Sequence, residues 1–103
     1  MKCEPWQVWW ANVKFEDSDE VKKRPVLILD TEKMIAFALK MTTHEPRRGD
    51  YILLDWQRAC LPKKTCVRFH QKLELCEDII TNQIGALSLL DIVNILRILK
   101  ALE

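Results

Sequence analysis

The stretch "KKRPVLILD", residues 22–30, decides how this chain folds. Its unbroken apolar run at 25–29 predicts a strand that is buried on both of its faces. Pro25 has no amide hydrogen for a sheet ladder, so it must begin the strand or lie on a sheet edge. Arg24 precedes it directly and places a guanidinium at the mouth of the strand, behind the acidic run "EDSDE" at 16–20. Such a charge needs a partner, either these acidic residues or an anionic ligand.

The remaining N-terminal part of the chain predicts further strands. Aromatic, β-branched and apolar residues favour strands at 6–15, 33–43, 51–56 and 65–75. Polar segments such as "HEPRRGD" at 44–50, which contains Pro and Gly, separate them. Five short strands with short links predict one domain over residues 1–103, built as a small barrel or curled sheet.

The C-terminal residues 88–102 change to helical spacing. Apolar side chains recur at Leu89, Ile92, Val93, Leu96, Leu99 and Leu102. Ser88 stands at the N-cap position and Asp91 follows three residues later, where both can satisfy free backbone amides. The polar residues form only a narrow stripe, namely Asp91, Asn94, Arg97 and Lys100. We therefore expect the sheet and a second subunit to cover this helix, and a short helix or turn at 76–85 to precede it.

Composition is that of an ordinary globular domain, with 49% hydrophobic and 30% charged residues and a net charge of +1. Residues 44–72 hold seven Lys or Arg against three Asp or Glu, which is either a local patch for phosphates or a solvated face. No apolar run is long enough for a membrane span, and the first residues lack the apolar middle of a signal peptide. The expected location is the cytoplasm.

The four cysteines favour free thiols over a metal site. Cys3, Cys60, Cys66 and Cys76 contain no C-x-x-C spacing, and the chain has only two histidines. A zinc site needs two closely spaced ligand pairs. We expect no metal and buried or half-buried free thiols.

The order of motifs resembles the MazF/PemK toxins of bacterial toxin–antitoxin pairs. Six segments between about Trp6 and Leu102 carry the resemblance: "VWWANV", the acidic loop, "KKRPVLIL", "MTTHEPRRGDY", "CVRFHQ" and "IGALSLLDI". Two positions depart from the family pattern. Glu4-Pro5 stands where Gly-Asp or Gly-Glu often opens the first strand, and His70 stands where an aspartate commonly follows the arginine at 68.

The resemblance implies a small SH3-like β-barrel with a C-terminal helix, usually a homodimer. It also implies an endoribonuclease that cuts single-stranded mRNA at short sequences and is held inactive by a cognate antitoxin protein. The expected products carry 2′,3′-cyclic phosphates, and no cofactor is expected.

Metal-free RNA cleavage needs a base for the 2′-hydroxyl proton, an acid for the leaving 5′-oxygen and positive charge on the transition state. By the resemblance, Arg24 is the active-site arginine and Thr42 the threonine that holds a phosphate oxygen, with Thr43 in the place of a family serine. A planar guanidinium on a stiff strand suits a phosphate. The alternatives are an arginine paired with the acidic run and a threonine that merely suits a strand.

Three further residues are candidates for catalysis. His44 follows the threonines, and its imidazole can exchange protons near neutral pH, although a lone histidine in a loop is more often merely exposed. Arg68 and His70 lie two apart on a strand, so we expect their side chains on one face. His70 would then replace the family aspartate in moving a proton. The alternative for both is structural pairing with Glu74 or Asp55.

Other residues are candidates for binding RNA. Those expected to steer its backbone are Arg47, Arg48, Lys63 and Lys64. The tryptophans Trp9, Trp10 and Trp56 either stack on bases, with Trp10 the candidate, or pack in the core or an interface. The acidic run at 16–20 is either a solvated connection or a lid over the RNA groove.

Two other functions stay open. A CcdB-like toxin has the same fold but poisons DNA gyrase without cutting nucleic acid. A catalytically silent barrel would act as a dimeric binding module. The matched arginine and threonine favour the nuclease.

Overall fold

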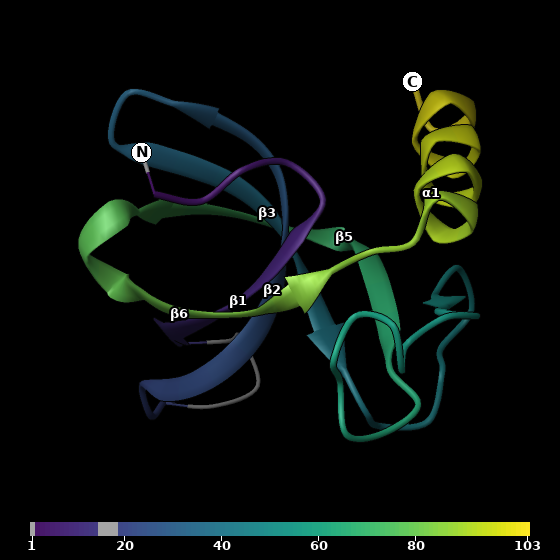
Figure 1. Cartoon of the computed structure of the whole chain (residues 1–103), viewed down its shortest axis with the longest axis horizontal. Coiled ribbons are helices and arrows are strands. Elements are labelled where there is room, and N and C mark those ends of the chain that lie inside the picture. The colour runs from purple at the N-terminus through teal and green to yellow at the C-terminus, as the bar shows by residue number, and fades with distance from the viewer. Residues whose placement is uncertain (1, 15–18) are drawn as a thin grey trace.

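The computed structural model describes residues 2–14 and 19–103 of the chain (Figure 1). Its elements in chain order are β1 (Gln7–Val13), β2 (Lys22–Glu32), β3 (Ile35–Thr42), β4 (Tyr51–Ile52), β5 (Cys66–Cys76), the 3-10 helix η1 (Glu77–Ile79), β6 (Ile80–Ala86) and α1 (Leu89–Ala101). The fold is mainly β with one C-terminal helix, which confirms the predicted class.

The strands form one antiparallel sheet in the order β4-β5-β3-β2-β1-β6. The sheet curls strongly, and α1 lies beyond one end of it (Figure 1). It is not closed into a barrel, because β4 and β6 remain its two edges among the described residues. The prediction of a curled sheet is therefore confirmed, whereas a closed barrel is not seen.

Two segments differ from the prediction. Residues 80–86 form a strand, β6, where a short helix or turn was expected, because they pair with β1. Gly85 allows the loop after β4 to pack closely against this strand, since a Cβ there would lie 2.2 Å from the carbonyl oxygen of Ala59. The strand predicted at 51–56 is only two residues long. The amides of Leu54 and Asp55 donate to the carboxylate of Asp91 instead of to a neighbouring strand.

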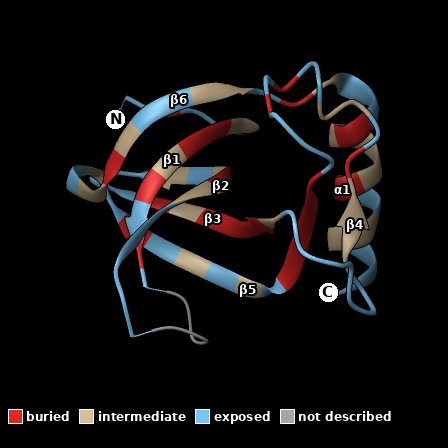
Figure 2. Ribbon diagram, turned by 90° about the horizontal axis from the view of Figure 1, so that it is seen from below, coloured by how far each residue is buried: buried red, intermediate tan, exposed pale blue. Residues whose placement is uncertain are grey.

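Strand β2 is buried on both faces, as its apolar run predicts. Val26 and Ile28 belong to one core, with residues of β1, β3 and β6, and Leu27 belongs to another core on the opposite face. The second core includes Ile95 of α1 and residues of the loop that follows β4. Figure 2 shows buried residues along β1, β3 and β5, with β4 lying beside α1. Because both faces are filled, polar chemistry is left to the ends of the strands.

Helix α1 begins as predicted but is oriented differently. The hydroxyl of Ser88 accepts a hydrogen bond from the amide of Asp91 at 3.3 Å, so Ser88 is the N-cap. Asp91 is completely buried and is not part of an exposed polar stripe. Several leucines are exposed instead, namely Leu89, Leu90, Leu96 and Leu102. Within the described residues, no helix is long and apolar enough to cross a membrane.

All four cysteines are free thiols, as expected. Cys3 and Cys66 are buried, but Cys60 and Cys76 are exposed, which the sequence did not indicate. Cys60 lies in a tight turn with a φ of 62°, and Cys76 lies at the last position of β5.

Candidate active site

Arg24 and Thr42 lie at the same end of the β2–β3 pair. Val26 pairs with Lys40 at this end of the ladder, and Arg24 and Thr42 each lie two residues further along β2 and β3. Both side chains line one pocket with a volume of about 230 Å³. The β2–β3 hairpin therefore brings the two residues together, although they are separated by most of two strands.

The described lining of this pocket is strongly positive. Its cations are Lys23, Arg24 and Lys40, and no aspartate or glutamate is among the described residues that line it. Lys40 is only 4% exposed, so its ammonium group has little access to bulk water. A pocket with this charge and this burial favours an anionic ligand.

Lys23 and Lys40 were not predicted as site residues. Lys40 is a polar residue inside the apolar strand β3, two positions before Thr42, and this spacing alone places both on one face. The ammonium group of Lys23 lies 5.6 Å from the ring centre of Trp10, which also lines the pocket. The alternation of side chains along β3 therefore indicates Lys40 as a residue of the same site as Thr42.

Thr42 lines the pocket, and its hydroxyl accepts one hydrogen bond from within its own segment. Its Oγ1 accepts a hydrogen bond from the amide of His44 at 3.2 Å, which leaves the hydroxyl hydrogen free to donate. His44 is exposed and lines the same pocket, as does the exposed Thr43. Arg24, Thr42 and His44 are thus the predicted catalytic residues that the structure brings together.

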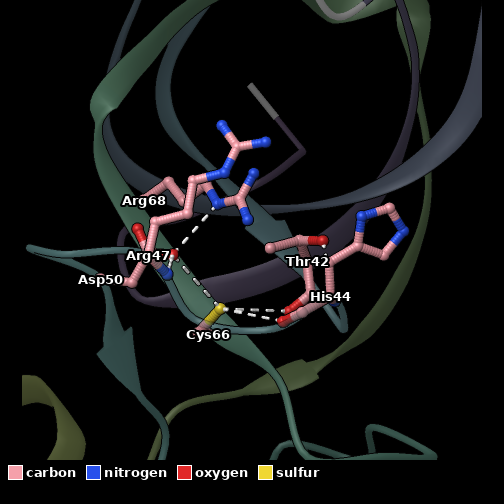
Figure 3. Close-up of polar contacts among 6 residues, drawn as sticks. All are labelled: Thr42, His44, Arg47, Asp50, Cys66 and Arg68. Carbon is pink, nitrogen blue, oxygen red and sulfur yellow. Dashed lines mark hydrogen bonds and ion pairs between the residues drawn. The ribbon is translucent and has the colours of Figure 1, made fainter. Parts of the chain in front are cut away.

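A buried thiol supports this segment from behind (Figure 3). The Sγ of Cys66 lies 3.5 Å from the carbonyl oxygen of Thr42, 3.9 Å from that of His44 and 3.8 Å from Oδ2 of Asp50. Burial raises the pKa of the Cys66 thiol, and the nearby Asp50 carboxylate raises it further. The thiol is therefore protonated and can donate its weak hydrogen bond to these acceptors.

Arg68 is a buried structural partner of Asp50. Its Nε lies 3.1 Å from Oδ2 of Asp50, and the two side chains are 2% and 0% exposed. The alternatives considered for this arginine, Glu74 and Asp55, are therefore not the partners found. Arg68 is absent from the described lining of both polar pockets at this end of the sheet.

A turn that contains Gly49 places Asp50 beside Arg68. The amide of Asp50 donates to the carbonyl of Arg47 at 2.9 Å, and the amide of Arg47 donates to Oδ2 of Asp50 at 2.8 Å. Gly49 has a φ of 91°, which side-chain-bearing residues rarely adopt. The "RRGD" segment is therefore a turn that directs the Asp50 carboxylate inward, and its Gly49 is the sequence feature that indicates such a turn.

His70 lies on the same side of β5 as Arg68 but outside the pocket. It is exposed, and its Cε1 lies 3.3 Å from the point where a Cβ of Gly49 would stand. The ladder between β3 and β5 is irregular here, because Leu39 pairs with Lys72 whereas Lys40 pairs with Arg68. Both side chains thus approach the 49–50 turn, and neither lines the pocket of Arg24 and Thr42.

A second pocket of about 150 Å³ adjoins the first. The two share Thr43, His44 and Thr65 in their linings. Its own lining adds Glu45, Pro46, Ile52, Lys64 and Cys66. The two pockets therefore meet at one end of the sheet.

The other predicted RNA-binding residues are spread around these two pockets. Trp10 lines the first pocket and Lys64 the second, whereas the exposed Arg47, Arg48 and Lys63 line neither. Trp9 is buried and Trp56 packs against the second core, so both have packing roles. Of the acidic run, residues 16–18 lie outside the described residues. Asp19 and Glu20 are exposed and form ion pairs with Lys14 and Lys22.

Within residues 2–14 and 19–103, no group of three or more His, Cys, Asp or Glu side chains is placed to hold a metal ion. No protein-family model matches the chain, and no curated protein matches its sequence.

Proposed function

We propose that this protein is an endoribonuclease that cleaves single-stranded RNA without a metal ion, as the toxin of a MazF/PemK-type toxin–antitoxin pair. The observation that carries the proposal is the shared pocket of Arg24 and Thr42. Phosphoryl transfer to a neighbouring hydroxyl depends chiefly on positioning and on positive charge around the phosphate. The three cations and the hydroxyls of Thr42 and Thr43 in this lining supply both.

Each residue then has a role in the reaction. The 2′-oxygen attacks the phosphorus, the 5′-oxygen leaves, and a 2′,3′-cyclic phosphate remains. Arg24 and Lys40 stabilise the charge on the phosphoryl oxygens, and Thr42 donates a hydrogen bond to one of them. His44 carries one of the two proton transfers, because it lines the same pocket and its imidazole can gain or lose a proton.

Arg68 and His70 take different parts in this proposal. Arg68 is a positioning residue, since it holds Asp50, which lies near the Cys66 thiol behind Thr42 and His44. His70 lies in the exposed margin of the site, where a swing toward the RNA strand would be needed for proton transfer. We therefore assign this proton transfer to His44 in preference to His70.

The same proposal covers the fold family and the partners. Under this proposal the curled sheet, with β4 and β6 as its edges, would be an incompletely closed SH3-like barrel. The exposed leucines of α1 provide an apolar face of the kind that a homodimer buries, and the positive pocket provides a site for an acidic segment of an antitoxin. The proposed place of action is the cytoplasm, where mRNA is found.

The test is cleavage of a long unstructured RNA by the purified protein in EDTA. We expect discrete fragments with 2′,3′-cyclic phosphate ends, and a fall in rate of about a hundredfold or more for Arg24→Ala. Arg97→Ala is the matched control, because Arg97 is exposed on α1 and lines neither pocket. Circular dichroism of both variants establishes that they are folded.

Two outcomes would overturn the proposal. One is intact RNA after incubation with the wild-type protein, and the other is equal cleavage by wild type and Arg24→Ala. Inhibition of DNA gyrase in a supercoiling assay, without RNA cleavage, would instead support the CcdB-like alternative.

A further inference from the structure

We propose that the second pocket binds one guanine base beside the cleaved linkage, with Glu45 as the residue that determines this specificity. The inference rests on the proposed function, because it assigns a subsite to the same RNA. It concerns a pocket to which the chemistry of cleavage gives no role.

The position of the pocket suits a neighbouring nucleotide. Thr43, His44 and Thr65 line both pockets, so the second begins where the first ends. A phosphate held by Arg24 and Thr42 would leave the adjacent base within reach of the second pocket. Its volume of about 150 Å³ allows for one heterocycle and not for a longer segment.

The lining matches the edge of guanine. Guanine presents two neighbouring N–H donors, on N1 and N2, and one acceptor, O6. Glu45 is the acidic residue in the described lining, and its two carboxylate oxygens can accept from both donors. Lys64 lines the same pocket and can donate to O6, while Pro46 and Ile52 offer apolar contact to the ring.

The other bases match less well. Adenine and cytosine each place a ring acceptor beside a single amino group, so one carboxylate oxygen would face an acceptor. Uracil has one N–H between two carbonyl oxygens, and these carbonyls repel a carboxylate. Only guanine satisfies both oxygens of Glu45 at once.

The walls of the pocket are held in place, as a specificity site requires. The Cys66 thiol lies 3.9 Å from the carbonyl of His44, and the amide of Arg47 donates to the buried Asp50, so both ends of the 44–47 segment are anchored. On the opposite side, Thr65 donates to the carbonyl of Lys63 at 2.8 Å, which fixes the backbone that carries Lys64.

The test uses binding, so that it does not depend on cleavage. The probes are two labelled 2′-O-methyl oligouridines that carry a single guanosine or, in its place, an inosine, which lacks only the N2 amino group. For the wild-type protein we expect the inosine probe to bind about tenfold more weakly. Glu45→Gln should bind the two probes equally, because its amide offers only one acceptor. Glu32→Gln, an exposed glutamate that lines neither polar pocket, should keep the wild-type preference.

The outcomes separate this inference from the proposed function. Equal binding of both probes by the wild type, a preference retained in Glu45→Gln, or no binding of either probe would overturn the guanine subsite. If RNA is cleaved in EDTA without preference for a flanking guanosine, the subsite fails and the nuclease stands. If the guanosine probe is preferred but no RNA is cleaved, the nuclease fails and the pocket stands.

Discussion

Two aspartates with fully buried side chains hold the two halves of this molecule in different ways. Asp50 lies near the candidate active site, and its Oδ2 accepts from the Arg68 guanidinium and the Arg47 amide, while its Oδ1 has no hydrogen-bond partner among the described residues. Asp91 lies on α1, and its two oxygens accept from the Tyr51 hydroxyl at 2.6 Å and from two backbone amides at 2.9 Å. One charge is balanced by a cation and the other by neutral donors.

The difference has consequences for stability and for function. A buried carboxylate with a cationic partner leaves an uncompensated charge when one partner is removed. When a carboxylate surrounded by neutral donors is removed, these donors remain without hydrogen bonds. Such unsatisfied groups cost less free energy than an uncompensated charge. The Asp50 cluster is therefore the more fragile of the two, and it supports the pocket. The Asp91 cluster attaches the helix to the loop after β4.

The largest effect is expected for Asp50→Ala. It leaves the Arg68 guanidinium buried without its carboxylate, so the free energy of unfolding should fall by about 3–5 kcal/mol. Urea unfolding followed by tryptophan fluorescence measures this change. The double variant Asp50→Ala with Arg68→Met should recover a large part of the loss, because neither charge of this pair is then buried. A double variant that is less stable than Asp50→Ala would contradict the account of Arg68.

An effect of intermediate size is expected at Tyr51. Burial and the hydrogen bond to Asp91 raise the pKa of Tyr51 from its usual 10 to about 12. Because the folded state holds the proton more tightly, stability from this group is complete below pH 10 and is lost as the pH rises toward 12. Tyr51 is the single tyrosine, so the absorbance of tyrosinate titrates it alone. The same titration in urea should give a midpoint near 10, and equal midpoints in both states would refute the prediction.

Tyr51→Phe provides the control for that pH dependence. It removes the titrating group while keeping the ring, so its loss of stability between pH 10 and 12 should be smaller than that of the wild type. At neutral pH it should be less stable by about 1.5–3 kcal/mol, the range for a hydrogen bond to a charged group.

The same comparison shows which features could be predicted from the sequence. The burial of β2 on both faces follows from its apolar run, and the helix start follows from Ser88. The meeting of Arg24 and Thr42 was anticipated only through the order of family-like motifs. Lys40 was detectable, because a lysine in an apolar strand two residues before Thr42 must share its face.

Other features depend on contacts that local patterns do not encode. The polar residues of β6 become a strand because β1 pairs with them. Asp91 has the spacing of an exposed stripe, but the loop at 54–55 closes over it. Arg68 forms an ion pair with Asp50, which lies 18 positions away in the sequence. The positive φ of Gly49 is what turns that carboxylate inward.

The smallest effect is expected in the alkylation rates of the four cysteines, which compare the enclosed Asp50 cluster with the surface. Thiol alkylation requires access and the thiolate, and burial raises the pKa of both Cys3 and Cys66. We expect Cys60 and Cys76, which are exposed, to be alkylated by iodoacetamide at least about tenfold faster than Cys3 and Cys66. Peptide mass spectrometry after timed quenching gives the rate at each site, and the urea-unfolded protein, in which all four should react alike, is the control. Rapid alkylation of Cys66 in the native protein would mean that its thiol, which lines the second pocket, is open to solvent, and the neighbouring Asp50 would then not be enclosed.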